Sequence, residues 1–226
     1  MEIVITNRRT VAQMAIEIPE AINVFNKYGI DYCCGGNKPL DQVCMEKNID
    51  LEKLMSEIPK GSLKPSSDQR YENWSPDFLA DYIENNHHTF VRERIPEIKD
   101  LLEKLYSKHG RDFPELYELS ETFEKLSEDL YSHMKKEELI LFPAIRKTIR
   151  EKIEVDVAAP IVVMEHEHEV AGGLLKTIRK ITNDFTLPQE ACTTWQIAYK
   201  RLFEFEQDLM LHIHLENNIL FKKVSI

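Results

Sequence analysis

The sequence is poor in residues that break or cross-link a chain. It has only 7 glycines among 226 residues, while helix-favouring glutamate, lysine, leucine and isoleucine are abundant, so helix is favoured over sheet. Its four cysteines do not suggest a disulfide framework, because Cys33 and Cys34 are adjacent and a bridge between neighbours forces a strained ring. These two cysteines are therefore candidates for redox chemistry or metal ligation, with two free thiols near a turn as the simpler alternative.

Two further absences limit the partners and the location. No run approaches the roughly 18 uncharged apolar residues of a membrane span. The first residues lack the basic segment and apolar stretch of a secretory signal. A formal net charge of −10 argues against nucleic acid or an anionic membrane as the main partner. We therefore expect a soluble, cytoplasmic protein, and its hydrophobic fraction of 42% is sufficient for a packed core.

The chain is predicted to contain a small helical domain, a linker and a larger domain. Apolar residues at three- and four-residue steps predict short helical segments over 9–28 and 39–58, separated by a loop that carries the adjacent cysteines. A polar run that contains two prolines then marks the best boundary in the chain. The predicted divisions are residues 1–60 for the N-terminal domain, 61–75 for the linker and 76–226 for the main domain.

The main domain is predicted to be an antiparallel four-helix bundle, so the fold class is all-α. Ser75 is a suitable N-cap, and Pro76 suits the first position of a helix. The four predicted long helices span residues 76–107, 113–149, 156–183 and 188–221. Long helices with short connections favour an up-down-up-down arrangement.

The second and fourth predicted helices contain the same motif. The segments from His133 to Phe142 and from His212 to Phe221 both read His-x3-Glu-x2-Ile-Leu-Phe. The helix before each motif also offers a histidine, which lies 45 positions before His133 in the first case and 44 before His212 in the second. The bundle is therefore predicted to use one helical hairpin twice.

Each motif places a histidine and a glutamate on one face of a helix, because residues four apart lie above one another. The apolar residues that follow direct this face toward the core, where an unpartnered carboxylate is costly and a bound metal relieves that cost. We predict two ions, each held by two histidines and both bridged by Glu137 and Glu216. Iron, manganese and zinc all accept these ligands; bridging glutamates in a four-helix bundle favour iron or manganese, and zinc stays open.

Helical periodicity decides between neighbouring histidines. His88 is favoured over His87 by the apolar stripe of its helix, and His168 is favoured over His166 because it shares a face with the apolar residues around it. The stripe that favours His88 comprises Phe78, Leu79, Tyr82, Ile95 and Ile98. His214 faces away from the motif, so we expect it either at the surface or behind a ligand.

Segments from both predicted domains resemble a known family. The N-terminal segments are Ile18-Pro-Glu-Ala, Phe25 and Tyr28-Gly-Ile-Asp-Tyr-Cys-Cys-Gly-Gly36, and the later ones are His133-Met-Lys-Lys-Glu-Glu-Leu-Ile-Leu-Phe-Pro143 and Leu215-Glu-Asn-Asn-Ile-Leu-Phe221. In this order, over nearly the whole chain, they resemble the bacterial repair-of-iron-centres proteins of the YtfE/ScdA type, which have a hemerythrin-like domain. One departure is Lys222, which stands where the first motif has Pro143, beyond the candidate ligands.

The resemblance implies a centre of two non-haem iron ions with an oxo or hydroxo bridge. Matching of the motifs places its ligands on His88, His133, Glu137, His168, His212 and Glu216. The resemblance also implies repair of iron–sulfur clusters damaged by oxidative or nitrosative stress, with damaged iron–sulfur proteins as partners. It assigns Cys33 and Cys34 to the handling of nitric oxide or electrons. Donation of iron from the pair is the leading hypothesis.

Three other functions remain open at this level. The centre is also suited to reduce or scavenge nitric oxide, with the adjacent cysteines supplying electrons. A reversible sensor of oxygen or nitric oxide, similar to hemerythrin, does not need the cysteine segment and ranks lower. A bundle that holds zinc for structure alone is the last alternative. Whether the protein turns over as an enzyme, and whether it forms a homodimer, is left open.

Overall fold

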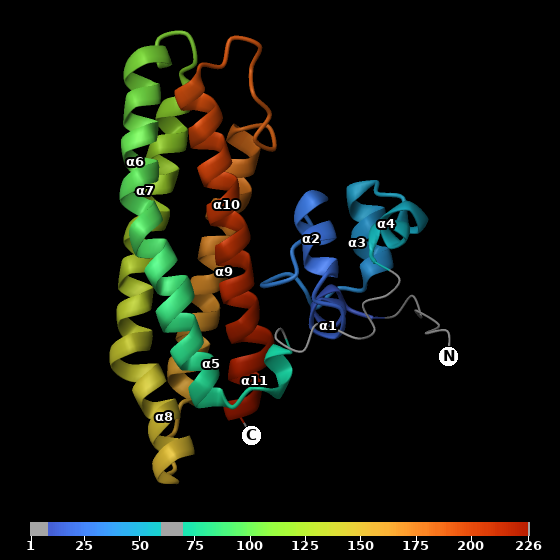
Figure 1. Ribbon diagram of the computed structural model, residues 1–226, viewed down its shortest axis with the longest axis vertical. Coiled ribbons are helices and arrows are strands. Elements are labelled where there is room, and N and C mark those ends of the chain that lie inside the picture. Colours follow the sequence, from blue (N-terminus) through green and yellow to red (C-terminus); the bar gives the residue numbers. More distant parts are fainter. Residues whose placement is uncertain (1–8, 60–69, 226) are drawn as a thin grey trace.

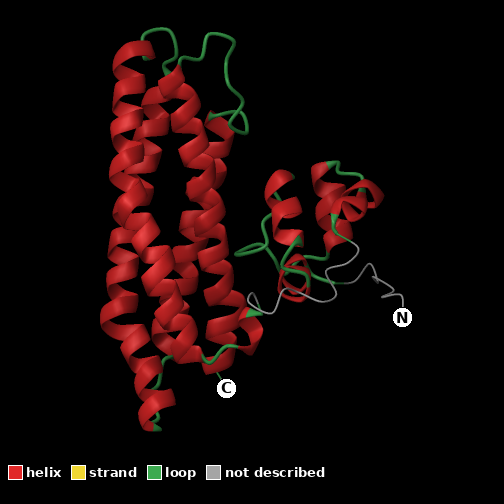
Figure 2. Ribbon diagram, in the orientation of Figure 1, coloured by secondary structure: helices red, strands yellow, loops and turns green. Residues whose placement is uncertain are grey.

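The structure, a computed structural model, describes residues 9–59 and 70–225, and all regular elements in these ranges are helical apart from one isolated bridge (Figure 2). A long bundle forms one part, and a group of short helices lies against the side of that bundle (Figure 1). Within the two ranges, no helix is long and apolar enough to cross a membrane.

The bundle consists of four antiparallel columns, as predicted (Figure 1). The columns are α5 (Pro76–Tyr82) with α6 (Thr89–His109), α7 (Glu115–Lys136) with α8 (Phe142–Glu151), α9 (Ala158–Ile181), and α10 (Thr193–Leu215) with α11 (Phe221–Val224). Helix α7 packs along α6 and α9, and α10 packs along α6. The predicted fourth helix began too early, because residues 188–191 form a turn in which Ala191 N–H donates to the Pro188 carbonyl (3.0 Å).

Three of the four columns contain a wide π-helical turn. These turns span Ile83–His88, Glu137–Leu141 and Glu216–Leu220. The first ends at a predicted ligand, and the other two begin at one. π-Helical turns are rare and are frequently found at functional sites. The turns therefore mark the level of the bundle at which the predicted ligands lie.

The N-terminal part is helical, as predicted, but each of its two predicted segments is a pair of short helices. The four are α1 (Val11–Glu17), α2 (Ala21–Lys27), α3 (Leu40–Lys47) and α4 (Leu51–Glu57). The first pair is interrupted around Pro19, and the second at Asn48, which adopts a left-handed conformation with φ of 54°. Asparagine tolerates this region better than most residues, so it ends α3 at little cost.

The predicted linker, residues 61–75, lies mostly outside the described residues. Its end is structured: Tyr71–Asn73 form a 3-10 turn, and the Trp74 ring lies 5.1 Å from that of Tyr82 on α5. Phe78, predicted to face the core, is instead 51% exposed and packs edge-on against Trp74. The chain before α5 thus covers part of the helix surface.

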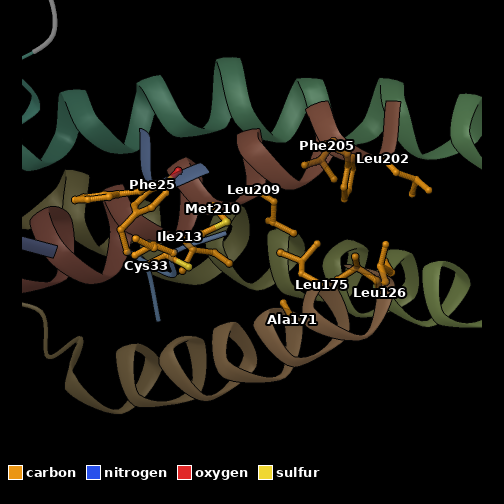
Figure 3. Packing of buried hydrophobic residues seen from close by; sticks show 14 of the residues in the cluster. Phe25, Cys33, Leu126, Ala171, Leu175, Leu202, Phe205, Leu209, Met210 and Ile213 are labelled. Carbon is orange, nitrogen blue, oxygen red and sulfur yellow. The ribbon is translucent and has the colours of Figure 1, made fainter. Parts of the chain in front are cut away.

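The hydrophobic core falls into two clusters. The larger one joins the N-terminal part to the bundle, with Phe25 and Cys33 packed near Met210 and Ile213 of α10 (Figure 3). The smaller cluster fills the other end of the bundle and is built from all four columns. A layer of buried polar residues separates the two clusters, and this layer contains the candidate site.

Candidate metal centre

All six predicted ligands meet in the polar layer. Their ligand atoms form two groups, and within each group every atom lies within 4.8 Å of the others. The first group is His88, Glu137, His212 and Glu216, and the second is His133, Glu137, His168 and Glu216. Both glutamates belong to both groups. The structure therefore produces the arrangement of two sets of histidines around two shared carboxylates.

Each glutamate lies between histidines of different groups. Glu137 Oε2 is 3.2 Å from His88 Nε2 and 3.3 Å from His133 Nε2. On the opposite side, Glu216 Oε1 is 3.0 Å from His212 Nε2, and its Oε2 is 3.1 Å from His168 Nε2. The i, i+4 spacing within each motif accounts for one contact of each glutamate, and the neighbouring column supplies the other.

These close contacts do not satisfy the buried polar atoms. Both carboxylate oxygens of Glu137, Oε2 of Glu216 and Nε2 of His88 lack a hydrogen-bond partner among the described residues, although all three residues are fully buried. A distance near 3 Å without suitable angles is not a hydrogen bond. Unsatisfied buried carboxylates are costly, and a bound cation removes this cost. The residues present therefore fit a metal site.

The buried charges of the layer shift one another's pKa values. Burial disfavours ionised Glu216, but His212 and His168 outweigh it and hold the pKa of this carboxyl well below its usual range. Burial lowers the pKa of His133, yet Glu137 and Glu216 raise it to about 9. For His212 burial prevails and the pKa is lowered. A metal ion must displace the proton of a histidine with a raised pKa such as His133, so its binding depends on pH.

Three of the four histidines have a polar side-chain partner at Nδ1, the ring nitrogen that faces away from the glutamates. We call such a partner the support of the histidine. His88 Nδ1 lies 2.7 Å from Glu138 Oε1, and His133 Nδ1 lies 3.0 Å from Glu167 Oε2. His168 Nδ1 lies 2.7 Å from Asn217 Oδ1. Such partners orient metal-binding histidines and fix the ring nitrogen that faces the metal. Sequence reasoning missed all three, although each is adjacent in sequence to a predicted ligand.

The cysteine loop docks beside this layer. Asp31 Oδ1 accepts hydrogen bonds from the backbone N–H groups of Cys33, Cys34 and Gly35 at 3.0–3.2 Å, which closes the loop. The two sulfur atoms are 3.6 Å apart, and Cys34 Sγ lies 3.2 Å from the His168 carbonyl oxygen. The hydrogen bond with Cys34, burial and the Asp31 charge raise the pKa of the Cys33 thiol well above its usual value.

Polar residues of the bundle hold the loop in place. Asn218 Nδ2 donates to the Cys33 carbonyl oxygen at 3.2 Å, and Lys176 forms an ion pair with Asp31 at 2.9 Å. His214 Nδ1 lies 3.1 Å from the Tyr32 carbonyl oxygen. His214 is 1% exposed, so of its two expected positions the one at the surface is wrong. Its Nδ1 faces the N-terminal loop and Asn218 Nδ2 (3.1 Å) rather than a candidate ligand.

The histidines that periodicity rejected lie outside the two groups. His166 is exposed on α9. His87 is buried, but its Nδ1 is 2.9 Å from Asp208 Oδ1, and its ring stacks on His212 at 5.6 Å between centroids. A cavity of about 320 Å³ lies between α7, α9 and α10 and is bordered by His133, His168 and His212.

Comparison with known proteins places this bundle in a defined class. Residues 80–224 match the model of the hemerythrin HHE cation binding domain. Residues 7–61 match the ScdA_N model, which is described as a domain of unknown function (DUF542). A hemerythrin-type bundle with buried histidines and glutamates thus follows the smaller N-terminal unit.

Relatives share both parts over nearly their full length. The iron-sulfur cluster repair protein ScdA of Staphylococcus haemolyticus (strain JCSC1435) is 34% identical over 98% of this chain and 100% of the relative. The iron-sulfur cluster repair proteins YtfE of Dickeya chrysanthemi (strain Ech1591) and Escherichia coli O8 (strain IAI1) are 37% and 39% identical, over 95% and 93% of this chain and 96% and 94% of theirs. The chain belongs to this family of iron–sulfur cluster repair proteins, so the resemblance predicted from its motifs is confirmed.

Proposed function

We propose that this protein holds two iron ions in its polar layer and gives up iron to rebuild damaged iron–sulfur clusters. The sharing of Glu137 and Glu216 between the two groups of ligand atoms carries this proposal. His88 and His212 would hold one ion, and His133 and His168 the other. Ferrous iron held in this way supplies both metal and electrons for cluster repair.

The ligand chemistry is consistent with a store that can release its metal. No cysteine is present in either group of ligand atoms, and soft thiolates are the ligands that hold iron in clusters. Imidazole and carboxylate bind iron only in their unprotonated forms, so protons compete with the metal. The bundle therefore shields the iron from water without holding it as an iron–sulfur scaffold does.

The adjacent thiols would act next to this store. Cys34 contacts the backbone of His168, and the sulfur of Cys33 lies beside that of Cys34. Oxidation of both thiols to a disulfide releases two electrons and two protons. The strained ring of a disulfide between neighbours is readily reduced again, so the pair can pass electrons from an added reductant to damaged clusters or ferric ions. Cys33 and Cys34 are therefore proposed to take part in the reaction, although neither belongs to the ligand groups.

A reconstitution assay tests the proposal. Protein loaded anaerobically with ferrous iron is mixed with an enzyme whose [4Fe–4S] cluster has been damaged by nitric oxide, and recovery of that enzyme's activity is followed. We expect faster and more complete recovery than with the same amount of ferrous iron and a small thiol. Glu137→Ala is expected to lose the effect, and Glu128→Ala, at an exposed site on the same column, is expected to keep it. Recovery no better than with free iron and thiol contradicts the proposal.

The cavity beside His133 and His168 favours a second candidate function. Its volume of about 320 Å³ admits molecules as small as nitric oxide or oxygen. Reduction of two nitric oxide molecules to nitrous oxide and water consumes two electrons and two protons, which the thiols can supply once and an added reductant repeatedly. Nitrous oxide formed over many turnovers would establish this activity, whereas a single turnover would leave a stoichiometric scavenger.

A further inference from the structure

The two halves of the repeated hairpin support their histidines unequally. Alignment of the two halves in sequence also pairs the residues next to the ligands. The equivalent pairs are His88 with His168, His133 with His212, Glu138 with Asn217, and His87 with Glu167. Two of the four histidines have Nδ1 partners at equivalent places. A third, His133, has a partner whose equivalent in the other half is His87, and the fourth, His212, has none among the described residues.

The supported histidines follow the repeat. His88 and His168 each face the residue directly after a motif glutamate, Glu138 in one half and Asn217 in the other, both at 2.7 Å. His133 faces Glu167, the residue directly before His168, at 3.0 Å. Repetition of this last contact in the other half would require a carboxylate directly before His88.

That position holds His87, and in the part of the chain that the structure describes His212 therefore lacks a carboxylate partner at its Nδ1. His87 turns its Nδ1 to Asp208 and lays its ring nearly parallel to that of His212, with 15° between the ring planes. His212 Nδ1 is buried and has no hydrogen-bond partner within the described ranges. A stacked imidazole neither fixes which nitrogen of His212 carries the proton nor increases its basicity toward a metal, as Glu167 does for His133.

We propose that the two metal subsites are unequal: the subsite of His133 and His168 binds its ion more tightly, and the subsite of His88 and His212 empties first when an acceptor competes for metal. Glu137 and Glu216 are common to both subsites, so the difference comes from the histidines. Two supported histidines serve the tight subsite and one serves the weak subsite. Loss of one such support changes metal affinity by about 10- to 100-fold. The inference rests on the proposed iron centre and adds which ion is given away.

Equilibrium occupancy is the quantity that tests this inference. The cavity borders His133, His168 and His212, so access from solvent affects how fast ions leave, but not where one ion resides at equilibrium. The metal-free protein is given one equivalent of ferrous iron without oxygen and crystallised, and anomalous scattering at the iron edge locates the metal. We expect most of it between His133 and His168. Equal occupancy, or a preference for His88 and His212, overturns the inference.

Two matched variants test the cause in solution. Glu167→Gln removes the carboxylate behind His133, and Glu138→Gln removes the one behind His88; both residues are partly exposed, and each forms an ion pair with a basic neighbour. Competition with a chromophoric chelator gives the two stepwise dissociation constants, and the quantity compared is the ratio of the larger constant to the smaller one. We expect Glu167→Gln to reduce the ratio about 10-fold or more and Glu138→Gln to increase it. Equal changes in both variants contradict the inference.

The outcomes separate this inference from the proposed function. A wild-type protein that binds no iron at all would disprove the proposed centre, and the inference would fall with it. Two ions bound with indistinguishable affinities would overturn only the inference. Circular dichroism of both variants shows whether either one has lost its fold, and the occupancy measurement on the wild type decides the question independently of them.

Discussion

Cys34 Sγ lies 3.2 Å from the backbone carbonyl oxygen of His168, a residue 134 positions further along the chain. This contact joins the N-terminal part to the bundle. It does so at His168, which belongs to one of the two groups of ligand atoms. The thiols and the candidate metal layer are therefore neighbours in space, and one chemical step can involve both. The position of the loop then becomes a property that mutations of the bundle can change.

Asn218→Ala is expected to loosen the cysteine loop. The substitution removes the hydrogen bond to the Cys33 carbonyl oxygen, and loss of one buried hydrogen bond costs about 1 kcal/mol. We therefore expect alkylation of Cys33, which is 5% exposed in the native structure, to be about five- to tenfold faster. The rate is measured by mass spectrometry of the peptide that contains Cys33 and Cys34.

Two internal comparisons make this result interpretable. Cys192 lies at the start of α10, away from the loop, and its alkylation rate is expected to stay constant. Asn23→Ala, at an exposed position of the N-terminal part, serves as the matched control. An unchanged rate for Cys33 in Asn218→Ala would show that this contact does not hold the loop.

Glu137→Ala is expected to lose at least one iron ion per chain. The carboxylate contributes to both groups of ligand atoms, so its removal affects both subsites. Elemental analysis together with Mössbauer spectroscopy measures the loss. Glu216→Ala, its equivalent in the repeat, is expected to behave in the same way, whereas Glu128→Ala should retain the wild-type content. Full iron content in Glu137→Ala would exclude the proposed bridging role.

The stability that Asp31 provides is expected to disappear in acid. Burial opposes ionisation of this carboxyl, but the Lys176 ion pair and the Gly35 N–H outweigh burial and hold its pKa below the usual value of 3.8. A carboxyl with a lowered pKa in the folded state stabilises that state above its unfolded pKa and loses this effect as the pH falls through its folded pKa.

Urea unfolding of the wild type and Asp31→Asn, each between about pH 3 and pH 6, measures this effect. Asparagine cannot ionise, so the difference between the two free energies of unfolding should be largest above about pH 5 and should shrink below about pH 4. A difference that is constant over this range would show that the charge of Asp31 is not responsible.

Gly36→Ala and Gly173→Ala are expected to change stability in opposite directions. A Cβ at Gly36 would lie 2.6 Å from the Tyr32 carbonyl oxygen and 2.8 Å from Ala12 Cβ, and overpacking of this kind costs on the order of 1–3 kcal/mol. Gly173 lies exposed within α9 with nothing within 4 Å, so alanine there should stabilise the helix by about 0.5–1 kcal/mol. Thermal unfolding of the metal-free proteins measures both, and destabilisation by both would contradict the expectation for Gly173.

The four-helix bundle was predictable because its apolar residues follow the helical period over long stretches. The same period distinguished His88 from His87, and the structure places His88 in the layer and His87 outside the ligand groups. The assignment of the six residues as metal ligands stays a prediction. The start of α10 was wrong by five residues, because helical periodicity does not distinguish a turn that precedes a helix from its first turn.

The wide turns and the docking of the cysteine loop were not predictable from periodicity. A π-helical turn adds one residue to a helix and shifts the apolar pattern after it, which in the sequence is indistinguishable from a small irregularity. The docking depends on single polar side chains, Asn218 and His214, that meet backbone carbonyl groups more than 180 positions away. No local signal connects such partners.

The polar layer interrupts the apolar core of the bundle. The apolar clusters on its two sides are separate, so ions bound in the layer would join the four columns at a level where hydrophobic packing does not. Loss of the ions would let α5 and α8 move together relative to the rest of the bundle, because their contacts are mostly with each other and with the wide turns beside them. A loaded and a spent molecule would then differ in the rigidity of one end, so a partner that touches this end could distinguish full molecules from empty ones.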